Sequence, residues 1–189
     1  AYTYPDCDKT EAAEYYKKAC EDLGKDTFTF EMLVQDSDTA QNVAAYVQNQ
    51  VQNALPGVTI TLRVETRKQL TADMRASEYD LGITRWGADY SDPMTFLGLW
   101  STGASNNFGK WSNAKYDEII ESSTTGELAL DAAARWQALK EAEKINMDEN
   151  VVIPIYETHT SIIMNPAVSG VEFHSVGITR CYKNADIAQ

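Results

Sequence analysis

Two aromatic residues and two aspartates gather in one short segment of the sequence. They are Trp86, Asp89, Tyr90 and Asp92. The segment follows a run rich in β-forming residues, and ligands of open α/β sheets bind beyond the carboxyl ends of the strands. An aromatic ring offers apolar area and a carboxylate offers charge-assisted hydrogen bonds. The segment therefore suits a cationic or amphipathic small molecule.

The same residues also fit a purely structural role. Trp86 could pack in a core, and Asp89 and Asp92 could shape turns, since aspartate before proline is common there. The residue types alone leave both interpretations open.

The sequence contains no recognisable catalytic arrangement. A glycosidase needs two carboxylates about 5 to 9.5 Å apart across the scissile bond. Asp89 and Asp92 are three positions apart on one loop, so we expect one ligand contact and one turn former. A Gly-x-Ser-x-Gly elbow and phosphate-binding glycine loops are absent. His159 and His174 lack metal-binding spacing. We expect no catalytic residue, no metal and no cofactor, and hence not an enzyme.

Alternating helix and strand patterns must position this segment. The predicted helices cover residues 8–24, 38–55 and 67–76, and the predicted strands cover residues 27–34, 58–65 and 79–86. This order favours an α/β fold with a mainly parallel central sheet flanked by helices. In the first helix, Tyr15 and Tyr16 are predicted core residues.

The second half of the sequence begins with a long turn-rich stretch. Residues 87–113 form a connection of a length that is usually functional or mobile. Helices are predicted next, over residues 113–123 and 127–148, followed by strands over residues 151–156 and 160–164 and an extended tail. Because it contains Pro154, the strand over residues 151–156 should lie at a sheet edge or pass between substructures.

Composition narrows the classes of protein that remain. Asp and Glu outnumber Lys and Arg by 28 to 16, which gives a net charge of -12 and argues against nucleic-acid binding. No run approaches the roughly 18 apolar residues of a membrane span. Cys7, Cys20 and Cys181 have no Cys-x-x-Cys spacing. A bridge from Cys7 or Cys20 to Cys181 is left open.

Ordered landmarks extend over nearly the whole chain. They are Tyr79-Asp80-Leu81, Trp86-Gly87-Ala88-Asp89-Tyr90-Ser91-Asp92-Pro93, Asn106-Asn107-Phe108, Lys115-Tyr116-Asp117, Arg135-Trp136, Ala142-Glu143 and Ile153-Pro154-Ile155-Tyr156. Together they resemble the C-terminal lobe of the peptide-binding proteins of ABC transporters, in the oligopeptide and dipeptide branch.

The resemblance implies a two-lobed receptor of the type II periplasmic-binding-protein kind. Residues 1–189 would form one lobe, and the N-terminal lobe would be absent from this chain. The implied function is extracytoplasmic binding of peptides or a related solute, delivered to an ABC-transporter permease. The location would be the periplasm or a cell surface, with membrane attachment only through a lipid anchor outside this chain. The alternative is the ligand-sensing lobe of a solute-responsive regulator or signalling receptor.

The resemblance also implies roles for individual residues. Asp89 would pair with the α-ammonium of a bound peptide, and the backbone from Arg85 to Gly87 would bind the peptide as an added strand. Trp86 would form the wall of a side-chain pocket. Further implied contacts are Tyr156, Asn106 and Asn107.

One position departs from the family pattern. Oligopeptide binders can carry an arginine three positions before the tryptophan for the ligand's carboxyl end, and here that position is Ile83. Carboxylate recognition must then come from Arg85, Arg67 or the absent lobe, or the ligand differs in length or chemistry.

Overall fold

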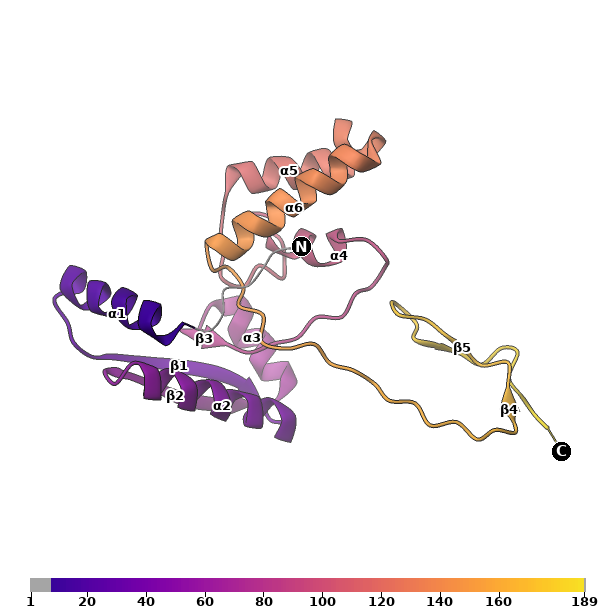
Figure 1. Cartoon of the computed structure of the whole chain (residues 1–189), viewed down its shortest axis with the longest axis horizontal. Helices are drawn as coiled ribbons and strands as arrows, with labels where there is room; N and C mark the ends of the chain where they lie inside the picture. The colour runs from indigo at the N-terminus through magenta and orange to yellow at the C-terminus, as the bar shows by residue number, and fades with distance from the viewer. Residues whose placement is uncertain (1–7, 189) are drawn as a thin grey trace. The chain divides into compact units, whose positions relative to one another are not determined.

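The computed structural model describes residues 8–188, which fall into two compact units divided between Arg85 and Trp86 (Figure 1). The elements of the first unit are α1 (Lys9–Leu23), β1 (Phe28–Gln35), α2 (Asp38–Ala54), β2 (Val58–Glu65), α3 (Arg67–Ala76) and β3 (Leu81–Gly82). All six were predicted, and only the length of β3 differs substantially from the prediction.

Side-chain caps fix where the helices of this unit begin. Asp8 Oδ1 accepts hydrogen bonds from the main-chain N–H groups of Thr10 and Glu11, at 2.8 and 3.1 Å. These bonds satisfy donors that the first turn of a helix leaves unpaired. Within α1, Tyr16 packs against the core, and its hydroxyl donates to the Asp26 carbonyl at 2.5 Å. Tyr15 is 68% exposed, so its predicted core position is wrong.

The central sheet of the first unit is parallel, in the order β2-β1-β3. β1 and β2 pair in register from Phe28↔Val58 to Gln35↔Glu65. Side chains alternate along each strand, and those of one face pack with α2 around the buried Ala44. Helices around a parallel sheet confirm the predicted α/β fold.

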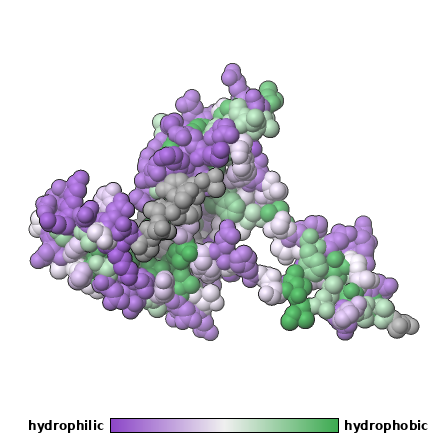
Figure 2. All heavy atoms as spheres, viewed as in Figure 1, coloured by the Kyte–Doolittle hydropathy of each residue, from purple (hydrophilic) through white to green (hydrophobic). Residues whose placement is uncertain are grey.

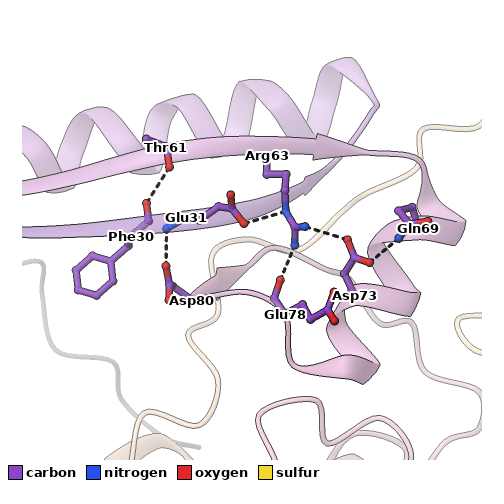
Figure 3. Close-up of polar contacts among 8 residues, drawn as sticks. All are labelled: Phe30, Glu31, Thr61, Arg63, Gln69, Asp73, Glu78 and Asp80. Atoms are coloured by element: carbon purple, nitrogen blue, oxygen red, sulfur yellow. Dashed lines mark hydrogen bonds and ion pairs between the residues drawn. The ribbon is translucent and has the colours of Figure 1, made fainter.

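Arg63, on the opposite face of the sheet, bonds to α3 and to the turn before β3 (Figure 3). Arg63 forms ion pairs with Glu31 at 2.9 Å and with Asp73 of α3 at 3.2 Å, and it donates a hydrogen bond to the Glu78 carbonyl. Asp80 accepts the main-chain N–H of Glu31 at 2.8 Å. These contacts determine where β3 enters the sheet.

β3 is much shorter than the predicted strand over residues 79–86. Only Leu81 and Gly82 pair with β1, and a last bond runs from the Ile83 N–H to the Leu33 carbonyl at 3.0 Å. Beyond Ile83 the chain has no strand partner in the described residues, so it continues as an extended segment into the second unit.

The second unit is built on helices. Its helical elements are α4 (Met94–Leu97), η1 (Gly98–Trp100), α5 (Ala114–Thr124), η2 (Glu127–Leu130) and α6 (Ala132–Asp148). The predicted helix over residues 127–148 is thus divided into η2 and α6. A core forms between α4, α5 and α6 around the fully buried Tyr116, whose hydroxyl donates to the Leu97 carbonyl at 2.6 Å.

After α6 the chain runs as a long extended segment with little regular structure (Figure 1). The predicted strands over residues 151–156 and 160–164 are not formed, because no described segment pairs with them. Two small antiparallel pairs follow, β4 (Val168–Ser169) with β7 (Asp186–Ile187) and β5 (Glu172–Phe173) with β6 (Arg180–Cys181).

The cysteines within the described residues are not crosslinked. Cys20 and Cys181 are free thiols, so the bridge between them that the sequence left open is not formed. Cys7 lies outside the described residues.

Candidate functional site

The segment that carries the predicted site lies directly after β3, where the two units meet in sequence. Arg85 is the last residue of the first unit and Trp86 the first of the second. Arg85, Gly87 and Asp89 are exposed, and the indole of Trp86 is 44% exposed. We refer to residues 86–93 as the Asp89 loop. It presents an aromatic ring and a carboxylate to solvent, as its predicted role requires.

The main chain just before Asp89 has unused hydrogen-bonding groups. Among the described residues, nothing forms a hydrogen bond with the N–H or C=O groups of residues 84–87. Main-chain groups left open in an extended segment are what an added ligand strand pairs with.

Asp89 has an anchored main chain, and its side chain has no partner among the residues that the structure describes. Its N–H donates to Thr95 Oγ1 at 2.9 Å, and Thr95 is only 4% exposed. Within residues 8–188, no hydrogen bond or ion pair engages the Asp89 carboxylate. The side chain is therefore open to a partner from outside the described residues.

Asp92 is the structural member of the two aspartates. Its Oδ1 accepts the N–H of Met94 at 2.9 Å, which shapes the turn into α4. Both carboxylate oxygens also accept from Arg135 of α6, at 2.7 and 2.9 Å. The Arg135 guanidinium is the main cause that holds the pKa of Asp92 below its usual range, and Asp92 in turn raises the pKa of Arg135.

The side chain of Asn107 forms hydrogen bonds within its own loop. It is 5% exposed, and its amide nitrogen donates to the carbonyls of Trp100, Ser101 and Trp111, at 3.3, 3.2 and 2.7 Å. Its Oδ1 accepts the N–H of Trp111 at 3.1 Å. These bonds hold together the loop between η1 and α5. A ligand contact by Asn107 stays a prediction, and in this structure its side-chain amide serves the loop.

The remaining predicted contacts are not joined to the Asp89 loop. Asn106 is half-buried, and Tyr156 is exposed in the extended segment after α6. Within residues 8–188, no hydrogen bond or ion pair connects either residue to the loop. Their roles stay predictions.

The turn between β5 and β6 reaches the Asp89 loop, which the sequence did not predict. The N–H of Gly177 donates to the Ala88 carbonyl at 3.2 Å. Gly177 has a φ of 67°, and a Cβ at this position would lie 3.2 Å from the Asp89 carbonyl oxygen. The glycine permits both the left-handed turn and the close approach. In the sequence, a glycine in the extended C-terminal tail is the only feature that could have indicated this contact.

The described residues contain neither a metal centre nor a membrane-spanning helix. Within residues 8–188, no group of three or more His, Cys, Asp or Glu residues could hold a metal ion, and both histidines are exposed. None of the helices described here combines the length and apolar character needed to span a bilayer.

The fold and this loop define a class of protein. Similar solved structures include peptide-binding components of ABC transporters, and the chain shares their type II periplasmic-binding-protein-like fold. The oligopeptide ABC transporter substrate-binding domain of Bacillus anthracis aligns with a TM-score of 0.84 and 36% identity, over 96% of this chain and 35% of that chain. OppA of Listeria monocytogenes, solved bound to peptide, aligns with a TM-score of 0.80 and 27% identity, over 96% and 34%.

The family follows from the sequence comparison. The profile of the bacterial extracellular solute-binding proteins, family 5, middle part, matches residues 1–108. The chain belongs to this family. The dipeptide-binding protein of Lactococcus lactis is 33% identical over 187 residues, which are 98% of this chain and 34% of that protein. The chain thus spans about a third of the length of such relatives, many of which bind oligopeptides or dipeptides.

Proposed function

We propose that this chain is one lobe of an extracytoplasmic peptide-binding protein that delivers its ligand to an ABC-transporter permease. In this proposal the Asp89 loop forms one wall of the ligand cleft. The observation that carries the proposal is the exposed carboxylate of Asp89, which has no partner in the described residues and is held on an anchored main chain in a member of this family.

The chemistry of the loop matches a peptide's amino terminus. The Asp89 carboxylate would accept charge-assisted hydrogen bonds from the α-ammonium. The open main-chain groups from Arg85 to Gly87 would pair with the peptide backbone, which makes binding largely independent of the peptide's sequence. Trp86 would supply apolar area to a ligand side chain. These are contacts of binding and release, with no bond broken.

The exposed apolar surface of the C-terminal segment supports a second lobe. Large apolar side chains of this segment face solvent (Figure 2). Ile163 is fully exposed. The most exposed are Ile153, Ile163, Ile178 and Ile187. Surface of this kind marks an interaction site. The partner we propose is the remainder of the same protein, since the relatives are about three times as long as this chain. It would supply the other wall and close on the ligand by hinge motion.

A charge-neutral replacement of Asp89 tests the proposal. In the complete two-lobed protein, Asp89→Asn should weaken binding of a peptide with a free amino terminus by about 2 kcal/mol, which is about thirtyfold in Kd. Binding of the N-acetylated peptide should change little, because that ligand has no ammonium to lose. Isothermal titration calorimetry measures both affinities.

A matched control removes the same charge elsewhere. Glu118 is an exposed residue of α5, and Glu118→Gln should leave both affinities unchanged. If the unmutated protein binds the free and the acetylated peptide equally well, Asp89 does not have the proposed role.

A further inference from the structure

Besides the turn bonds that Asp92 and Pro93 accept from the main chain of residues 94–97, three contacts within the second unit anchor the Asp89 loop. Thr95 of α4 accepts the N–H of Asp89 at 2.9 Å, and Gly177 donates to the Ala88 carbonyl at 3.2 Å. Arg135 of α6 binds the carboxylate of Asp92 through two bonds. Of these three anchors, only the one at Arg135 is made by a charged pair.

Arg135 connects three parts of the unit at once. Besides its two bonds to Asp92, its Nε–H donates to the Ser123 carbonyl near the end of α5, at 2.8 Å. Its side chain is 22% exposed, and that of Asp92 is 31% exposed. The planar guanidinium can make all of these bonds in one orientation, which a lysine ammonium cannot do.

The helical core also has contacts in which Arg135 takes no part. α5 and α6 pack through a separate apolar cluster around Tyr116, Leu139 and Ala142. Arg135 lies in the first turn of α6, and its guanidinium points to the loop. Loss of the guanidinium should therefore affect the loop more than the helices.

We propose that Arg135 is a positioning residue for ligand recognition. Through Asp92 it fixes the turn that places Thr95 under the main chain of Asp89, so the Asp89 carboxylate is held in one position before the ligand arrives. A preorganised group loses little freedom on binding, which raises affinity without a new contact. This inference rests on the proposed function, because it takes Asp89 as the group that binds the ammonium.

The first test needs no ligand. Hydrogen exchange measured by mass spectrometry on the complete, ligand-free protein should be about tenfold faster over residues 88–97 in Arg135→Met than in the unmutated protein. Exchange over residues 116–120 and 139–146, which the side chain of Arg135 does not bind in the described structure, should stay unchanged. Equal acceleration in α5 and α6, or no change in the loop, would overturn the proposal.

The matched control breaks an ion pair that joins α5 to α6 instead of α6 to the loop. Lys115 of α5 pairs with Glu141 of α6 at 2.7 Å, and within residues 8–188 no hydrogen bond or ion pair joins these two side chains to the loop. Lys115→Met should leave exchange over residues 88–97 unchanged. Faster exchange of the loop in this variant would contradict a specific role for Arg135.

The second test measures ligand preference. Arg135→Met should lower the affinity for a free-amine peptide about tenfold and leave that for its N-acetylated form unchanged. Arg135→Lys retains the positive charge without the planar guanidinium and should recover part of the preference for the free-amine peptide. An equal loss for both peptides would mean that Arg135 only stabilises the fold. If the unmutated protein has no preference, the role of Asp89 fails, whereas the exchange result still decides whether Arg135 holds the loop.

Discussion

At the scale of single residues, the two aspartates of the loop have different roles. Asp92 is paired with Arg135 and caps a turn, whereas the carboxylate of Asp89 has no partner in the described residues. The sequence suggested this division, because aspartate before proline is typical of turns. It did not reveal Arg135 as the partner, since the two residues lie 43 positions apart and only the fold brings them together.

The Asp92 ion pair predicts a specific dependence of stability on pH. A carboxylate whose folded-state pKa is lowered stabilises the fold above its unfolded-state pKa, about 3.9, and loses this contribution as pH falls through the lower folded value. Asp92→Asn should therefore lower the melting temperature at pH 7. The difference from the unmutated protein should shrink below about pH 4, and calorimetry at several pH values measures it.

The control for this prediction is again Glu118→Gln, which removes a carboxylate that has no partner in the described residues. Its melting temperature should follow that of the unmutated protein across the pH range. A difference for Asp92→Asn that stays constant from pH 7 to pH 3 would show that the ion pair is not its source.

At the scale of elements, local pattern predicted most of the fold. The helices and strands from α1 to α3 follow amphipathic spacing and capping residues, which are encoded nearby in sequence. The strands predicted over residues 151–156 and 160–164 are not formed. Their sequences favour strands, but a strand needs a neighbour, and none is present in the described chain.

The contact between the β5–β6 turn and the Asp89 loop was also beyond sequence reasoning, and it can be tested with two glycines. Gly177 and Gly24 have φ values of 67° and 62°, so alanine at either position costs about 1 kcal/mol in backbone strain. Only at Gly177 would the new Cβ press on the Asp89 carbonyl, at 3.2 Å, while Gly24 has open space. Gly177→Ala should lower peptide affinity several-fold, as measured by calorimetry.

Gly24→Ala is the matched variant for backbone strain. It should lower the melting temperature without changing peptide affinity. If both variants bind peptide as the unmutated protein does, the turn has no influence on the loop.

At the scale of the whole molecule, the chain is a member of an extracellular solute-binding family and spans about a third of the length of its relatives. Its exposed apolar tail and unpaired carboxylate both indicate partners outside the described residues. We propose the remainder of the protein for the first and a peptide for the second.

The most direct measurement is a crystal structure of the complete protein with a bound peptide. A carboxylate oxygen of Asp89 should lie within about 2.7–2.9 Å of the peptide's terminal nitrogen. The peptide main chain should form hydrogen bonds with residues 85–87. A peptide amino group bound by another residue, with the Asp89 side chain turned away from the ligand, would show that Asp89 does not recognise the amino terminus.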